Sequence, residues 1–148
     1  MSPSAPVEKS VICLLRHGAI LAFRHPLAGV QLPKGTREPG ETPEDTARRE
    51  LFEEVGVQAF DTLEPLGTWN CPEPASTWHV FVAQAPDGLP SAWSHAPTGG
   101  GPESGLVFEV MWIGLSSAST VLHPLFLPVL GMVQSHLDQV ARDRASQS

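Results

Sequence analysis

Runs of apolar residues separated by turn residues divide this chain into short predicted strands. The apolar run at 10–15 has the length of a central strand, and Arg16-His17-Gly18 joins it to a second run at 19–24, which predicts a hairpin. The same pattern predicts one strand or two within 58–69, and single strands at 29–32, 77–85 and 106–113.

Two segments carry the signals of helices. Thr42-Pro43-Glu44-Asp45 has the form of a helix start, with a hydroxyl N-cap, proline at the first helical position and acids in the first turn, and Gly56 supplies a left-handed residue that closes a helix. A helix is therefore predicted over 43–55. From Pro124 onward, apolar residues recur at intervals of three and four, which predicts an amphipathic C-terminal helix that gives way to a polar tail at about Arg142.

Mixed strands with one helix in the middle and one at the end indicate an α/β/α sandwich with a mixed sheet. The chain is expected to be a single domain, 1–148, with flexible tails at about 1–8 and 142–148. Residues 86–105 are rich in proline and glycine and are expected to be irregular, either as a functional lid or as a mobile loop.

Composition narrows the possible partners and compartments. The net charge of −7 argues against nonspecific nucleic-acid binding, which requires a basic surface. The chain contains no apolar run of about 18 residues, so no membrane span is expected, and the N-terminus has no signal-peptide pattern. Cys13 and Cys71 have no zinc-site spacing, and Cys13 is expected to be a buried thiol. A cytoplasmic location is the simplest expectation.

The helix predicted at 43–55 carries a cluster of acids. At about 100° per residue, Glu50, Glu53 and Glu54 fall within an arc of roughly 100°, beside an apolar stripe of Ala47, Leu51 and Val55. Carboxylates this close repel each other unless a cation intervenes, and hard oxygen ligands suit Mg²⁺ or Mn²⁺. The alternative is a solvated surface helix held by Glu–Arg pairs.

The spacing around these acids matches a known motif at every fixed position. Gly35 is followed by five residues, Glu41, seven residues, and then the run Arg49-Glu50-Leu51-Phe52-Glu53-Glu54-Val55-Gly56-Val57. This is the spacing of the Nudix box, and the chain resembles the Nudix hydrolase family. The resemblance implies the α/β/α sandwich fold and metal-dependent cleavage of a diphosphate bond in a nucleoside diphosphate derivative, by attack of a metal-bound water.

The resemblance also implies roles for the residues of the box. Glu50, Glu53 and Glu54 correspond to the metal-binding carboxylates, and the backbone carbonyl of Gly35 often joins them. Arg49 corresponds to the arginine that orients the acids by ion pairing. Glu41 corresponds to a loop glutamate that can act as an outer-shell ligand.

The general base is less closely defined. Many Nudix sequences carry a glutamate three residues before a tryptophan in the strand preceding the last helix, and Glu109 precedes Trp112 in this way. Such a glutamate adds a metal ligand or deprotonates water. Glu103, in the glycine-rich segment, and Glu53 are the competing candidates.

Several residues outside the box are candidates for substrate binding. Arg24, Lys34 and Arg37, with His25 as a weaker case, have side chains that suit phosphate oxygens, although each is also compatible with a solvated surface charge. Trp93 is the preferred base-stacking candidate because it falls in the irregular segment. Core packing is favoured for three other aromatic residues, Trp69, Trp78 and Phe81, and His79 is expected to be a satisfied histidine within a strand.

The sequence leaves the substrate open. Leu32-Pro33-Lys34-Gly35 resembles the box entry of dinucleoside polyphosphate hydrolases, but the chain lacks the tyrosines that such enzymes often use. Nucleoside triphosphates, ADP-ribose and nucleotide sugars therefore remain candidates, and so does homodimer formation. The alternative functions are a non-catalytic regulatory module of the same fold, disfavoured by the intact box, and an isopentenyl diphosphate isomerase, disfavoured because it needs a modified box.

Overall fold

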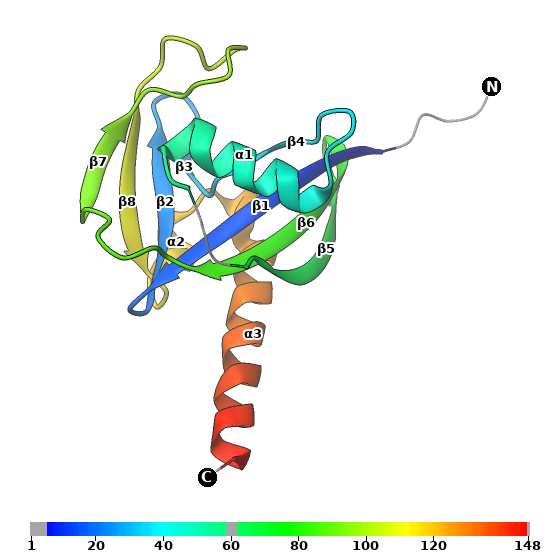
Figure 1. Ribbon diagram of the computed structural model, residues 1–148, viewed down its shortest axis with the longest axis vertical. Helices are drawn as coiled ribbons and strands as arrows, with labels where there is room; N and C mark the ends of the chain where they lie inside the picture. The colour runs from blue at the N-terminus through cyan, green and yellow to red at the C-terminus, as the bar shows by residue number, and fades with distance from the viewer. Residues whose placement is uncertain (1–5, 59–61, 148) are drawn as a thin grey trace, which may run out of the picture.

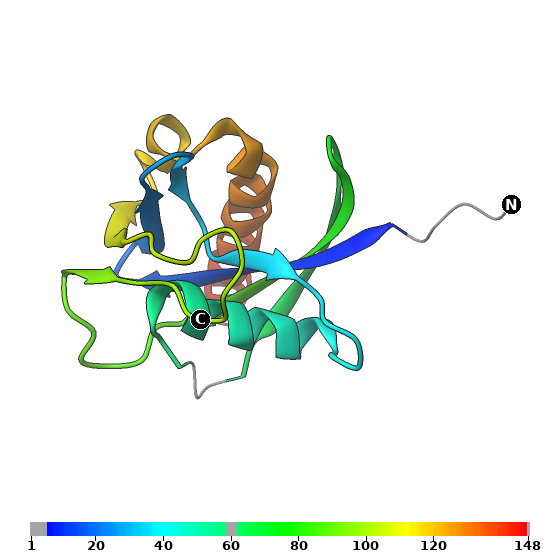
Figure 2. The ribbon, with the colours of Figure 1, turned by 90° about the horizontal axis from the view of Figure 1, so that it is seen from above.

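A computed structural model describes residues 6–58 and 62–147 of the chain. Within these residues, eight strands form one mixed sheet, with helices on both of its faces (Figures 1 and 2). The strands are β1 (Val7–Arg16), β2 (Ala19–His25), β3 (Gly29–Gln31), β4 (Lys34–Thr36), β5 (Glu64–Pro72), β6 (Ala75–Gln84), β7 (Ala92–His95) and β8 (Phe108–Gly114). The helices are α1 (Pro43–Val55), α2 (Ala118–Val121), the 3-10 turn η1 (Pro124–Phe126) and α3 (Leu127–Ser146).

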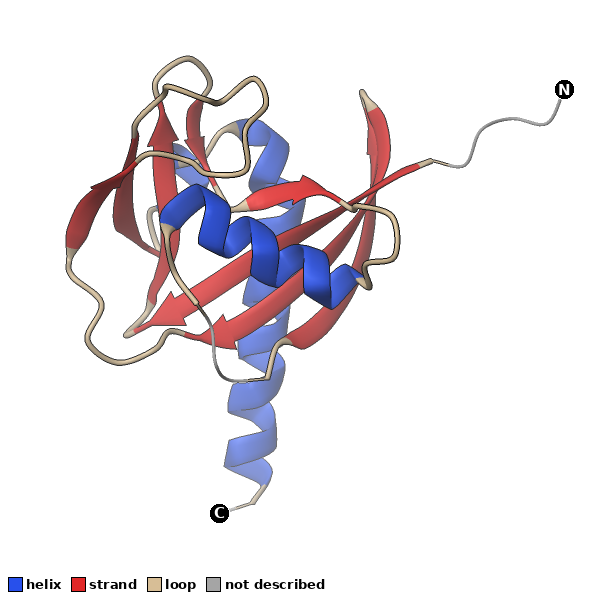
Figure 3. Cartoon of the chain, turned by 45° about the horizontal axis from the view of Figure 1, so that its top comes forward, coloured by secondary structure: helices blue, strands red, loops and turns tan. Residues whose placement is uncertain are grey.

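The sheet has the order β5-β6-β1-β2-β8-β7, in which β1 and β6 are parallel and the other neighbours are antiparallel. β1 and β2 pair only next to their hairpin, at Leu15–Ile20 and Arg16–Ala19. Beyond that point, β4 pairs with the first half of β1 and β3 pairs with the second half of β2. The two central strands therefore diverge, and the short strand β4 lies along β1 beside α1, with its contacts to the C-terminal half of that helix (Figure 3).

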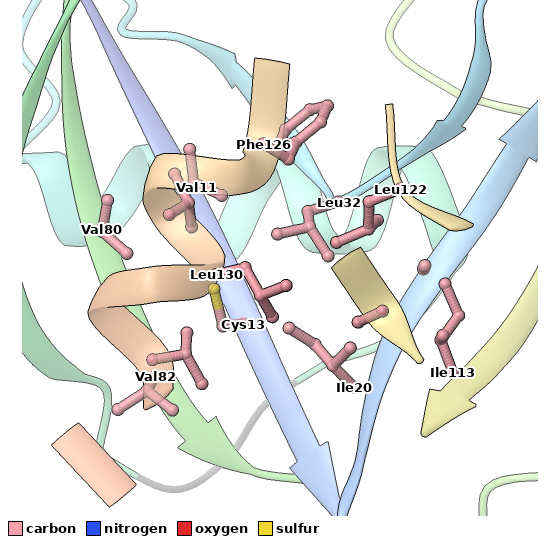
Figure 4. Packing of buried hydrophobic residues seen from close by; sticks show 14 of the residues in the cluster. Val11, Cys13, Ile20, Leu32, Val80, Val82, Ile113, Leu122, Phe126 and Leu130 are labelled. Atoms are coloured by element: carbon pink, nitrogen blue, oxygen red, sulfur yellow. The ribbon is translucent and has the colours of Figure 1, made fainter. Parts of the chain in front are cut away.

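The apolar run of β1 separates two hydrophobic cores. Successive side chains of a strand point to opposite faces. Val11 and Cys13 accordingly join the core under α3, whereas Ile12 and Leu14 join the core under α1. All four side chains are fully buried, and Figure 4 shows Val11 and Cys13 facing Leu130 of α3. The predicted α/β/α sandwich is confirmed.

Three expectations about local structure were wrong or incomplete. Residues 86–105 are not irregular throughout, because Ala92–His95 form the edge strand β7 on β8. The predicted tail from Arg142 is helical to Ser146, since side-chain bonds such as Arg142 Nη2 to Gln139 Oε1, at 2.8 Å, support the last turns of α3. At the other end, β1 already begins at Val7. No helix in the described ranges is long and apolar enough to cross a membrane.

Candidate active site

The helix α1 forms as its sequence predicts. Thr42 Oγ1 accepts a hydrogen bond from Asp45 N at 3.1 Å, and Asp45 Oδ2 accepts one from Thr42 N at 3.0 Å, which completes a capping box. Gly56 closes the helix in the left-handed region, with φ 78°, and its N–H donates to Phe52 O. The helix boundaries predicted from these signals are confirmed.

The buried and acidic faces of α1 are also distinct. Ala47, Leu51 and Val55 are fully buried against the sheet. Glu54 is 5% exposed, and the Glu50 and Glu53 side chains are 13% and 23% exposed. The acids therefore lie in a protected position next to β4 instead of on an open helix surface.

Arg49 holds the acids of this region together. Its Nε and Nη2 donate to the two carboxylate oxygens of Glu41 at 2.7 and 3.0 Å, and Nη2 also donates to Thr36 O at 2.9 Å. Its Nη1 donates to Glu50 Oε1 at 2.8 Å and to Glu53 Oε2 at 3.2 Å. The hydrogen bonds from Arg49 lower the pKa of Glu41 to about 2, so Glu41 is a permanent anion that fixes the guanidinium.

Two of the carboxylates are costly to ionise. Burial raises the pKa of Glu50 to about 7, against a smaller opposing effect of Arg49. Burial also raises the pKa of Glu54 well above its usual value, although its Oε1 accepts a hydrogen bond from Lys34 N at 2.7 Å. Gly35 packs so closely on the Glu50 carboxylate that a Cβ at this position would overlap it. The backbone of β4 and the two acids thus enclose a narrow polar space.

The segment after β7 closes over the C-terminal half of α1. His95 Nε2 lies 3.0 Å from Glu53 O, and Thr98 N donates to the same carbonyl at 3.0 Å. A Cβ on Gly99 would come within 2.7 Å of the Glu53 carboxyl carbon. This close packing brings Glu103 to the same pocket, where its Oε1 lies 3.9 Å from His25 Nε2.

These residues line an open pocket of about 600 Å³. Its acidic side chains include Glu50, Glu53, Glu54 and Glu103, and its cationic ones are Lys9, Lys34, Arg37 and Arg49. Burial, and then repulsion by Lys9, lower the pKa of Lys34. The pocket thus combines carboxylates that suit a divalent cation with cations that suit an anionic group.

Other predicted site residues lie outside this pocket. Arg24 and Glu109 are register partners on β2 and β8, and Glu109 Oε2 accepts a hydrogen bond from Ser94 Oγ at 2.8 Å. Neither residue lines the pocket. The indole of Trp93 is half-buried in β7 and donates to Val55 O at 2.9 Å, so it packs against the end of α1 and does not line the pocket.

The remaining aromatic residues and histidines have structural positions. Trp78 and Phe81 are 1% and 7% exposed, and Trp69 is half-buried with its ring edge-on to Trp78 at 4.9 Å. Core packing is confirmed for these three. His79 Nε2 lies 3.0 Å from Glu8 Oε1, which gives it the partner expected of a histidine within a strand.

The donor set fits a hard divalent cation, although the side chains are not preassembled around one. Among residues 6–58 and 62–147, no group of three His, Cys, Asp or Glu side chains is arranged as a ready metal site. The Arg49 guanidinium instead contacts Glu50 and Glu53 and offsets their negative charge. A metal cation bound to these carboxylates would offset the same negative charge. The raised pKa values of Glu50 and Glu54 and the close backbone of Gly35 favour a cation among these oxygens.

Sequence patterns missed one cation of the pocket. Lys9 occupies an alternating position in β1 and resembles any surface lysine in the sequence. Only the pairing of β1 with β4 and β6 brings it to the pocket.

Comparison with known proteins identifies related sequences and folds. Residues 6–128 match the family profile described as NUDIX domain. An RNA pyrophosphohydrolase of Yersinia enterocolitica is 45% identical over 60 residues, which cover 40% of this chain and 34% of that protein. An RNA pyrophosphohydrolase of Bartonella bacilliformis is 42% identical over 41 residues, covering 28% of this chain and 24% of that protein. The matched segments thus span about a third or less of these curated relatives.

Solved structures share the fold at low sequence identity. An ADP compounds hydrolase superposes with a TM-score of 0.68 at 24% identity, covering 93% of this chain and 76% of that chain. A MutT structure from work on Aliivibrio salmonicida and Vibrio cholerae superposes with a TM-score of 0.62 at 18% identity, covering 86% and 94% of the two chains.

Proposed function

Because this chain belongs to the NUDIX domain family, we propose that it is a metal-dependent pyrophosphohydrolase that cleaves the diphosphate bond of a nucleotide derivative. The observation that carries the proposal is the pocket in which the acids of α1 meet the backbone of β4. A catalytic pocket for phosphates needs ligands for a cation and further cations for the phosphate oxygens, and both line this one.

Glu50, Glu53 and Glu54, with the Gly35 carbonyl, would hold Mg²⁺ or Mn²⁺. When bound, such an ion neutralises phosphate charge and lowers the pKa of a coordinated water. Arg49 orients Glu50 and Glu53 through its Nη1. Because Glu41 is held as an anion by its hydrogen bonds with Arg49, the guanidinium keeps one orientation as the carboxylates change partners.

For the general base we propose Glu103 in preference to Glu109. Glu103 lines the pocket with the α1 acids, whereas Glu109 lies on β8 and is bound by Ser94. A base must come within hydrogen-bond reach of the proton that it removes. Glu53 remains the competitor within the pocket, but its Oε2 is engaged by Arg49 at 3.2 Å.

The substrate that we propose is a small nucleotide. A pocket of about 600 Å³ lies within the usual range for small-molecule sites. The relatives described as RNA pyrophosphohydrolases suggest an RNA 5′ end as a further candidate, but the net charge of −7 disfavours extended contact with an RNA chain.

A screen that measures release of nucleoside monophosphate tests the activity. The panel contains nucleoside triphosphates, diadenosine polyphosphates, ADP-ribose and nucleotide sugars, with Mg²⁺ or Mn²⁺. Glu53→Gln is expected to lower turnover by about a hundredfold or more, as the loss of a charged catalytic group does. The matched control is Glu44→Gln, which removes an acid from the same helix at a position outside the pocket. Binding of nucleotides with no turnover across the panel would favour the regulatory module instead.

A second pair of variants tests the base. Glu103→Gln is expected to lower kcat by about 10²–10⁴-fold and to shift the acidic limb of the pH–rate profile. Glu109→Gln is expected to have a much smaller effect because its partner is Ser94. The opposite ranking would assign the role to Glu109.

A further inference from the structure

Two lysines that line the pocket have their side chains on the face of the sheet opposite α1. In the pairing of β1 with β4, Lys9 lies opposite Thr36 and Val11 lies opposite Lys34. Paired residues and alternate residues of a strand share a face of the sheet, so Lys9 and Lys34 lie on the same face as Val11. That face also carries Trp78, which is the register partner of Lys9 on β6. The Lys34 Nζ stands 4.5 Å above the Trp78 ring and 5.4 Å from the Phe126 ring.

Among the described residues, neither lysine has an anionic partner within ion-pairing distance. Lys9 and Lys34 make no salt bridge with the described residues, although Glu54 and Glu103 attract Lys34 at longer range. Both side chains are half-buried, and each ammonium repels the other. Two unpaired cations at a partly desolvated position are unfavourable unless an anion joins them.

A purely structural role explains only part of this arrangement. Lysine stems commonly cover aromatic surface, and the Lys34 stem covers Trp78 in this way. That role needs neither a second lysine beside the first nor a place in the pocket wall. By contrast, Arg37, which also lines the pocket, is neutralised by Glu8 at 3.0 Å. Lys9 and Lys34 are therefore the pocket cations left available for an anion.

We propose that Lys9 and Lys34 form a subsite for the phosphate groups that extend beyond the diphosphate held at the α1 acids. The inference rests on the proposed function, because it places the scissile diphosphate at the carboxylates. A substrate with three or more phosphates reaches both parts of the pocket, whereas a substrate with two reaches only one. The protein accordingly selects nucleoside polyphosphates over nucleotide sugars and ADP-ribose.

The local chemistry suits phosphate. The Trp78 ring excludes water from one side of the Lys34 ammonium, which strengthens its attraction for a second charge. Gln31 also lines the pocket, and its side-chain amide, which donates one N–H to Ala28 O at 3.3 Å, has a second N–H. Since Lys9 and Lys34 come from separate strands, a phosphate between them would bridge β1 and β4.

The test compares substrates in wild type and Lys9→Met, which keeps the stem and removes the charge. For diadenosine tetraphosphate and ATP, kcat/KM is expected to fall about tenfold, equivalent to about 1.4 kcal/mol. For ADP-ribose it should change less than twofold. Lys9→Arg should retain the preference, and Arg142→Gln, which removes a cation from α3, is the control for net charge. Equal losses for all substrates, or no loss for any, would overturn the subsite.

A binding measurement separates failure of the subsite from failure of the proposed function. Inorganic tripolyphosphate and pyrophosphate are titrated into wild type and Lys9→Met in EDTA, where no turnover occurs. Wild type is expected to bind tripolyphosphate more tightly, and Lys9→Met should weaken that binding about tenfold without loss of melting temperature. If no hydrolysis is found but Lys9→Met weakens tripolyphosphate binding, the subsite is supported and the proposed hydrolase function is not. Equal tripolyphosphate affinities in the two proteins would refute the subsite even if hydrolysis is found.

Discussion

Replacing Gly56 with alanine tests the contact that joins β7 to α1. Gly56 has φ 78°, and a Cβ at this position would lie 2.9 Å from His95 Nδ1 and 3.0 Å from its Cε1. The same histidine lies 3.0 Å from Glu53 O through its Nε2. Gly88 provides a matched control, since it has φ 86° but no atom within 4 Å of its added Cβ.

The two substitutions share one cost and differ in another. An alanine in the left-handed region costs about 1–2 kcal/mol at either position. At Gly56 the His95 ring must also move, which removes its hydrogen bond to Glu53 O at a cost of about 0.5–1.5 kcal/mol, and it disturbs the packing of β7. We therefore expect Gly56→Ala to lower the free energy of unfolding by roughly 2–4 kcal/mol and Gly88→Ala by about half as much.

Urea denaturation at one pH and one salt concentration measures both values. In a His95→Ala background, Gly56→Ala should cost only about as much as Gly88→Ala does in wild type, because the ring that opposes the Cβ and its hydrogen bond to Glu53 O are already absent. If Gly56→Ala is no more destabilising than Gly88→Ala, then His95 does not fix β7 against α1. Glu103, at the end of the following segment, would then lack the anchor that we infer for it.

Three further predictions concern stability and the acids. Because burial raises the pKa of Glu50 in the folded protein from 4.5 to about 7, its contribution to metal-free stability should be greatest below pH 4.5, fall by about 3 kcal/mol between pH 4.5 and 7, and change little above pH 7. The raised pKa of Glu54 acts in the same direction. Glu41, with its pKa lowered to about 2, contributes stability that is lost only at lower pH, so it does not affect this window. Urea denaturation in EDTA should show this decline in the free energy of unfolding, and Glu50→Gln should make the decline smaller. Millimolar Mg²⁺ should restore the lost stability at pH 8. A free energy of unfolding that does not change with pH would contradict the assigned burial of Glu50. Gly35→Ala should displace the Glu50 carboxylate, which is the flexible end of its side chain, and so cost about 1 kcal/mol of stability while removing most of the Mg²⁺-induced rise in melting temperature. An undiminished Mg²⁺-induced rise in melting temperature would show that Mg²⁺ binding does not require the present position of the Glu50 carboxylate. Gly131→Ala, in α3 with open space around the added Cβ, should raise the free energy of unfolding by about 0.5–1 kcal/mol in the same denaturation assay, and a loss would mean that α3 is packed more tightly there.

Local sequence signals predicted the parts of the site that depend on short-range interactions. The capping box at Thr42, the proline after it and the closing glycine lie within one segment, so the ends of α1 at Pro43 and Val55 agree with the prediction. The acidic arc follows from helical geometry alone once those ends are known. Likewise, the alternation along β1 divides its side chains between two cores without any knowledge of the strands beside it.

Long-range pairing decided the elements that the sequence did not predict. Only four residues form β7, and the glycines and prolines around them conceal an edge strand that exists because β8 provides hydrogen-bond partners. The same pairing sets Ser94 beside Glu109. The segment that follows β7 then runs to the pocket, where Glu103 is one of the lining residues. A glutamate three residues before a tryptophan is a sequence signal for Glu109, but no such signal indicates how far its carboxylate lies from α1.

In our proposals, the residues that select the ligand and the residues that carry out the chemistry are therefore positioned in different ways, the first by long-range strand pairing and the second by one helix. The acids that we propose for the metal share one helix, so a short motif specifies their relative positions. Lys9 and Lys34 come from strands that meet only because β1 and β2 diverge and admit β4. Because Lys9 does not pair with Arg49 or the α1 acids, a change at Lys9 is expected to leave their contacts intact. Substitutions in β1 can consequently alter which phosphate chains bind without altering the proposed hydrolytic site, and a motif confined to residues 35–57 carries no information about that choice.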